Sequence, residues 1–161
     1  MNQYIRQIVD AHRQFYKSSC SPSLIELLLK IHDLVPLDFY ELQDCYQNQN
    51  IGLIHFRDKV FQGLRIHCHD ESKGQPYLSR LQELFAAGQI VALYCITPND
   101  PNRNRHGWIV EEIQSDRIYL LSKYSELGNG EGKQTARLDL PTAGHEAIQI
   151  SDLIYGRVVT P

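Results

Sequence analysis

The sequence predicts a single α+β domain, with helices in the first half of the chain and antiparallel strands in the second. Apolar residues recur at helical spacing over residues 4–12 and 21–32. After residue 90 the pattern changes to short apolar or alternating runs separated by turn residues, which is typical of strands and hairpins. The 161 residues match the length of one domain, and no internal repeat or linker divides them, so we expect one domain over residues 1–161.

The helix expected over residues 21–32 is apolar on most of its sides, which predicts a central, largely buried helix. Pro22 fits its first turn, because a proline there loses no backbone hydrogen bond. Cys20 therefore lies at the helix N-terminus.

The remaining elements follow from periodicity and from turn residues. Further helices are expected over residues 37–47 and 77–87, the second ending at Gly88. Residues 90–96 form a continuous apolar run, which predicts a central strand buried on both faces. The other strands are expected over residues 63–69, 106–113, 117–121 and 134–140, and a helical turn at 151–154 is expected to lead into a last strand at 156–159.

Composition narrows the classes of partner. The net charge of −3 is mild and the basic residues are scattered, so we expect no nucleic-acid partner. No apolar run approaches the roughly 20 residues that cross a bilayer, so no membrane insertion is expected. The first residues lack the pattern of a signal peptide, which makes the cytoplasm the default compartment and leaves signal-independent export open. The sequence does not indicate an oligomeric state.

The four cysteines are expected to be free thiols, because no CxxC pair occurs and no signal peptide precedes them. We expect Cys45 and Cys95 to be buried structural residues. His67 and His69 share one face of the strand expected there, and with His55 or Cys45 they would supply zinc ligands. Their spacing is not that of a recognised zinc module, so we expect neither metal nor cofactor, with a metal-binding regulator as an alternative.

Cys20 combines with two other residues into a candidate catalytic site. The dipole and the unpaired N–H groups of a helix N-terminus favour a thiolate, which is the form of cysteine that attacks carbonyl carbon. Gln14 precedes Cys20 by six positions, and His106 opens an apolar strand much later in the chain.

This order of residues resembles the papain-like cysteine peptidases. It is most similar to their compact bacterial branch, which includes the domains that cut double-glycine leaders from bacteriocins, and the likeness in element order spans essentially the whole chain. The resemblance implies a papain-like fold in which the helix with Cys20 packs on a C-terminal antiparallel sheet. It also implies that Cys20 is the nucleophile, that His106 accepts and returns the proton, and that Gln14 donates to the oxyanion.

One position departs from the family pattern. The family has an Asp or Asn that orients the histidine, and the matching place here is Ser122, whose hydroxyl accepts a hydrogen bond but supplies no charge. Asp116 lies in a turn at the far end of the strand, and Glu126 follows in a loop. Trp108, two residues after His106, shares its face on a regular strand and is either a core residue or a wall of the substrate cleft.

The first hypothesis is therefore a thiol-dependent hydrolase, a peptidase that acts on a peptide or protein through Cys20 and His106. The same machinery serves deamidases and acyltransferases, because the acceptor and the cleft decide the product. The second hypothesis is a catalytically silent papain-like domain that binds a peptide or a protein partner, and the serine at position 122 favours it.

Overall fold

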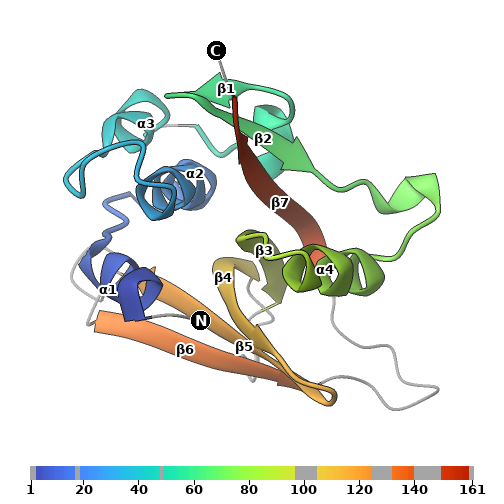
Figure 1. The fold of residues 1–161 in the computed structure, drawn as a ribbon. Helices are drawn as coiled ribbons and strands as arrows, with labels where there is room; N and C mark the ends of the chain where they lie inside the picture. Colours follow the sequence, from blue (N-terminus) through green and yellow to red (C-terminus); the bar gives the residue numbers. More distant parts are fainter. Residues whose placement is uncertain are drawn as a thin grey trace.

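The computed structural model describes residues 3–16, 19–47, 49–96, 105–124, 132–139 and 150–159, without the side chains of residues 96, 122–124 and 132–139. The described residues form helices packed against one antiparallel sheet, which confirms the α+β class (Figure 1). In this part of the chain, no helix combines the length and the apolar character needed to cross a membrane.

The elements follow one another with the helices mainly first. The helices are α1 (Gln3–Ala11), α2 (Cys20–Ile31), α3 (Glu41–Cys45) and α4 (Tyr77–Ala86), with short 3-10 helices η1 (Leu53–Phe56) and η2 (Glu71–Lys73). The strands are β1 (Val60–Phe61), β2 (Leu64–Cys68), β3 (Val91–Ile96), β4 (Arg105–Ile113), β5 (Arg117–Tyr124), β6 (Gly132–Asp139) and β7 (Ile150–Val158).

The seven strands form one sheet in the order β1-β2-β7-β3-β4-β5-β6. β3 is the middle strand, and its residues from Val91 to Leu93 are wholly buried, as its continuous apolar sequence predicts. Because the last strand, β7, lies between β2 and β3, the sheet joins segments from both halves of the chain. The cross-strand neighbours of β3 therefore come from β4 on one side and β7 on the other.

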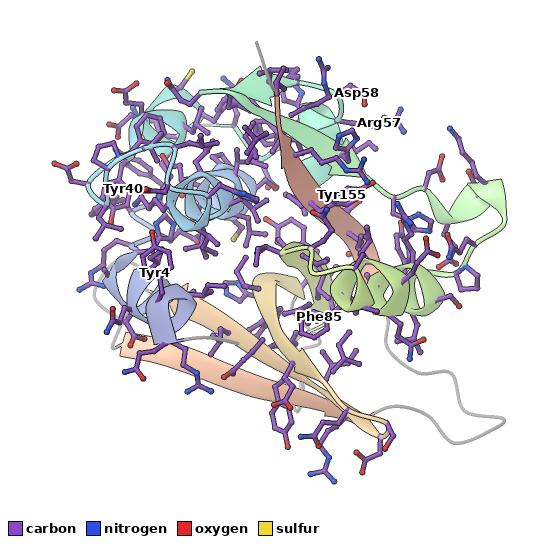
Figure 2. All side chains as sticks on the ribbon, in the orientation of Figure 1. Tyr4, Tyr40, Arg57, Asp58, Phe85 and Tyr155 are labelled. Atoms are coloured by element: carbon purple, nitrogen blue, oxygen red, sulfur yellow. The ribbon has the colours of Figure 1, made fainter. Side chains whose placement is uncertain are left out.

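The sheet separates two apolar cores. Helices α1 and α2 lie on one side and α4 on the other (Figure 1). Ala92, Ile109 and Ile154 face the α2 side, while Leu93 and Trp108 face the α4 side. Tyr155, labelled in Figure 2, also lies on the α4 side. The alternation along each strand thus assigns successive side chains to different cores.

Helix α2 is buried on all sides, and this includes its two charged residues. The Glu26 carboxylate accepts hydrogen bonds from the backbone N–H groups of Leu42 and Gln43 at the start of α3. The Lys30 ammonium lies 2.9 Å from His12 Nδ1 and 3.7 Å from the centre of the Tyr40 ring, which is labelled in Figure 2. Buried charges need such partners, and here they fix α2 against α3 and the end of α1.

Helix α3 is shorter than predicted. The expected helix over residues 37–47 shrinks to Glu41–Cys45, because Phe39 N–H closes a turn onto the Pro36 carbonyl before the helix begins. All four cysteines are free, as predicted. Cys95 is buried as expected, whereas Cys45 is exposed, so the prediction of a buried role for Cys45 is wrong.

The end of the chain corrects another prediction. Residues 151–154 form no helical turn, because β7 runs as one strand from Ile150 to Val158. Pairing with β2 on one side and β3 on the other satisfies its backbone, whatever the local preference of its polar residues. Gly156 fits inside this strand because a Cβ there would lie 2.6 Å from Leu64 Cδ2.

Candidate functional site

Gln14 and Cys20 meet at the start of α2. Gln14 is buried, 4% exposed, in the connector between α1 and α2. Its Nε2 atom donates to the Tyr16 carbonyl over 3.0 Å and to the Cys20 sulfur over 3.2 Å. Both N–H groups of the side-chain amide therefore donate hydrogen bonds, one of them to the sulfur of Cys20.

Cys20 is the first residue of α2 and is partly exposed. Ser19 precedes it, but its hydroxyl donates to the Tyr16 carbonyl and to Gln43 Oε1 and does not cap the helix. The N–H groups of a first helical turn have no partner within the helix, and together with the dipole they favour negative charge. The position thus suits a thiolate, as the sequence predicts.

His106 is the second residue of β4 and is 3% exposed. Burial lowers the pKa of its imidazole to about 4, so the ring is neutral at neutral pH. Its ring meets Trp108 edge to face, with 5.0 Å between the ring centres. Trp108 is 2% exposed and belongs to the core on the α4 side, so of its two predicted places the core is the observed one, not a cleft wall.

One small cavity brings the predicted residues together. Cys20, Gln14 and His106 line it along with His12 and Gly107, and its volume is about 10 Å³. A space of this size holds about one water molecule, so the lining groups surround a single small site. The cavity is thus lined by three of the residues predicted from the sequence, one in the connector between α1 and α2, one in α2 and one in β4.

Gly107 lets β4 approach α2 beside this cavity. A Cβ at position 107 would overlap Leu24 Cδ1 and lie 2.9 Å from Leu24 Cγ and 3.0 Å from Tyr94 Cε1. Any larger residue would push α2 and β4 apart. The glycine thus sets the spacing between the helix that carries Cys20 and the strand that carries His106.

Ser122 is the residue that the resemblance puts in the place of an orienting Asp or Asn. The backbone of Ser122 lies in β5 and pairs with Gln134 of β6, while its side chain is outside the described part. Glu126 also lies outside the described residues. Asp116 sits in the β4–β5 turn, where its carboxylate accepts two hydrogen bonds from Arg117.

Two residues at the thiol were not singled out by the sequence. The Tyr94 hydroxyl lies 3.0 Å from the Ser21 hydroxyl, which donates to the Ile51 carbonyl, and Tyr94 and Ser21 line the same cleft as Cys20. Burial and the charge of an ionised Cys20 hold the pKa of Tyr94 well above its usual value, so it stays a donor. The one feature of the sequence that could have indicated Tyr94 is its hydroxyl group within an otherwise apolar strand.

The histidines of the zinc alternative are not grouped around a metal position. His69 Nε2 lies 2.7 Å from the Gln75 carbonyl, and the His67 ring stacks on Tyr155 with 5.1 Å between centres. Among the described residues, no group of three or more His, Cys, Asp or Glu side chains has the arrangement that holds a metal ion. These two histidines act there as packing and hydrogen-bonding residues.

Comparisons with protein-family models, with curated proteins and with solved structures give no match for this chain. Any assignment of function therefore depends on the chemistry of the chain's own residues.

Proposed function

We propose that this protein is a thiol-dependent hydrolase of the papain-like type, a peptidase that works through Cys20 and His106 with Gln14 as oxyanion donor. The observation that carries the proposal is the 3.2 Å contact between Gln14 Nε2 and the Cys20 sulfur. The single-water cavity that these two residues share with His106 supports it further. Such a grouping of nucleophile, base and amide donor is what acyl transfer requires.

In the proposed reaction Cys20, Gln14 and His106 each have a separate role. The Cys20 thiolate attacks the carbonyl carbon of a peptide bond, and the carbonyl oxygen takes up the negative charge. The Gln14 amide and the backbone N–H of Cys20 donate to this oxyanion, each lowering the barrier by about 2.7–4 kcal/mol. His106 passes the thiol proton to the leaving amine, and water then hydrolyses the thioester and regenerates the thiol.

A second candidate function is that of a catalytically inactive papain-like domain, which binds a peptide or a protein next to Cys20. The pKa of His106, about 4, favours it, because a buried imidazole resists the charge that it must take up as a base. Relative to its ordinary value of 6.5, this shift opposes protonation by about 3 kcal/mol. A carboxylate would offset that cost, and the family position for it holds Ser122.

Alkylation of the four thiols at neutral pH tests the proposal. With a small neutral reagent such as iodoacetamide and mass spectrometry of each cysteine, Cys20 is expected to react fastest. Burial raises the pKa of Cys68 and of Cys95 to about 12 each, so both should react slowly, while exposed Cys45 gives the rate of an ordinary thiol.

The matched variants are His106→Ala and His69→Ala. The first should slow the labelling of Cys20 by roughly tenfold or more, and the second should leave it unchanged, because His69 bonds to a distant carbonyl. Labelling of Cys20 no faster than Cys45 would sink the enzyme proposal. Fast labelling of Cys20 without cleavage of any peptide in a library would instead favour the binding domain.

A further inference from the structure

A second, more open cleft begins at Cys20. Its volume is about 250 Å³, and Cys20, Ser21, residues 50–52, Tyr94, Arg105 and Asp152 lie along it. Pockets for whole small molecules usually measure about 300–1,000 Å³, so this cleft has the size for one side chain of a longer substrate. Its position beside the thiol makes it the place where a residue next to the attacked bond would lie.

The hydroxyl groups that line this cleft form hydrogen bonds within the protein. Ser21 Oγ donates to the Ile51 carbonyl over 2.8 Å and lies 3.0 Å from the Tyr94 hydroxyl. Ser151 Oγ donates to the Tyr94 carbonyl over 3.4 Å. These bonds join α2, the loop before η1, and strands β3 and β7 into one wall, and the two serines donate to the backbone rather than toward a ligand.

Asp152 differs from its neighbours in the cleft. It lies on β7, directly opposite Tyr94 of β3, and is half-buried. Within the described residues its carboxylate takes part in no ion pair and accepts no hydrogen bond, although Arg105 lines the same cleft. Burial raises the pKa of Asp152, and the charge of Arg105 lowers it. A half-buried carboxylate without a close partner is costly, and a cation would relieve that cost.

This carboxylate does not serve His106. Asp152 is on β7 and His106 on β4, with β3 between them. Asp152 lines the same cleft as Cys20 and pairs across the sheet with Tyr94. Asp152 is therefore close to the thiol without being the orienting residue of the imidazole.

We propose that Asp152 selects substrates with a positively charged side chain, lysine or arginine, beside the bond that Cys20 attacks. The inference rests on the thiol chemistry proposed above and adds a substrate class to it. A charged hydrogen bond of this kind distinguishes the cation from a neutral analogue by roughly 10- to 100-fold. Arg105 is exposed and Asp152 is half-buried, so solvent screens the opposing charge of Arg105 more than that of Asp152.

Charged thiol reagents test the selection without a known substrate. The probes are three methanethiosulfonates that carry an aminoethyl, a methyl or a sulfonatoethyl group. In each case the thiolate attacks the sulfenyl sulfur, a disulfide forms and methanesulfinate leaves. The ratio of the labelling rate with the aminoethyl reagent to that with the methyl reagent should be higher at Cys20 than at exposed Cys45, and Asp152→Asn should lower the ratio at Cys20 by about fivefold or more.

Two controls are internal to the chain. The same ratio at exposed Cys45 should not change in Asp152→Asn, and Arg105→Gln should raise the ratio at Cys20. If Asp152→Asn does not fold, the wild-type protein still gives a test, because the cation preference at Cys20 should shrink at 0.5 M salt. In the folded variant, an unchanged ratio at Cys20 overturns the inference, as does any preference for the anion.

Failure of this inference is distinguishable from failure of the proposed function. If Cys20 reacts rapidly with the neutral reagent but shows no preference for charge, the thiol chemistry survives and the role of Asp152 is lost. If Cys20 reacts no faster than Cys45 with any reagent, the proposed function itself fails. For cleavage, paired peptides with Lys, Gln or Glu beside the scissile bond should differ in kcat/KM in that order.

Discussion

The Gln43 side-chain amide donates a hydrogen bond to the Glu26 carboxylate over 2.7 Å, and both side chains are wholly buried. The same amide nitrogen donates to the Arg13 carbonyl over 2.8 Å. Its oxygen accepts from the Phe15 backbone over 2.8 Å and from the Ser19 hydroxyl over 3.1 Å. A single side chain on α3 thus holds the connector that carries Gln14 and leads into Cys20.

Gln43→Ala should destabilise the protein and loosen that connector. The variant leaves the buried Glu26 carboxylate and the part-buried Phe15 N–H with fewer hydrogen-bond partners, which we expect to cost about 2–4 kcal/mol in urea unfolding. Exposed Gln49 provides the control, because Gln49→Ala should change stability by less than about 0.5 kcal/mol. If the two variants were equally stable, Gln43 would not be the anchor of the connector.

Gly107→Ala should move β4 away from α2 and slow the reaction of Cys20. The added methyl meets the buried Leu24 side chain and the Tyr94 ring, an overpacking that costs about 1–3 kcal/mol. Gly156→Ala is the matched control, because it makes the same kind of clash with Leu64 at another part of the sheet. Both should lower the unfolding free energy, but only Gly107→Ala should also reduce the labelling rate of Cys20.

A double variant checks the physical cause. Leu24→Ala removes the group that the new methyl would meet, so adding it to Gly107→Ala should cost less than the sum of the two single variants. If the losses of unfolding free energy in the two single variants simply add in the double variant, Gly107 is not needed for the close approach of α2.

The local sequence pattern predicts the elements whose contacts are with residues nearby in the chain. Helix α2 follows from Pro22 and a helical repeat, and the β4–β5 hairpin follows from a turn between two apolar runs. The sequence predicts only the last part of strand β7, because the pairing of the whole strand with β2 and β3 links residues far apart in the chain. No local signal shows that Gly156 stands where Leu64 packs.

The same reasoning explains which residues of the candidate site the sequence predicts. Gln14 and Cys20 are neighbours along the chain, and their contact depends on one connector. Tyr94 and Asp152 enter the site only because β7 and β4 flank β3, an arrangement that no spacing in the sequence encodes. Trp108 had two possible places by alternation alone, and burial against α4 decided between them.

Tyr94→Phe should slow the alkylation of Cys20 by roughly tenfold at neutral pH, because a thiolate loses a hydrogen-bond donor. The fold should tolerate the change at about 0.5–1.5 kcal/mol, since Ser21 keeps its bond to the Ile51 carbonyl. Tyr155→Phe is the control: it removes the bond from Arg80 to a tyrosine hydroxyl on the α4 side. Equal labelling of Cys20 in the two variants would remove Tyr94 from the site.

Stability should fall on acidification because His106 is buried as a neutral ring. Its folded pKa of about 4 is below the ordinary 6.5, so its contribution is present above pH 6.5 and is lost as the pH falls through 4. The pKa of His12 is also lowered, by burial and by the charge of Lys30, and this acts in the same direction. The loss from His106 should reach about 3 kcal/mol in urea unfolding between pH 7 and 4.

Glu26 opposes this trend and allows the two contributions to be separated. Burial raises its pKa from 4.5 to about 7, so its contribution is present below pH 4.5 and is lost as the pH rises through 7. His106→Asn should therefore flatten the acid loss between pH 6.5 and 4, whereas Glu26→Gln should make it steeper. A wild-type slope that His106→Asn leaves intact would mean that burial does not hold the imidazole neutral.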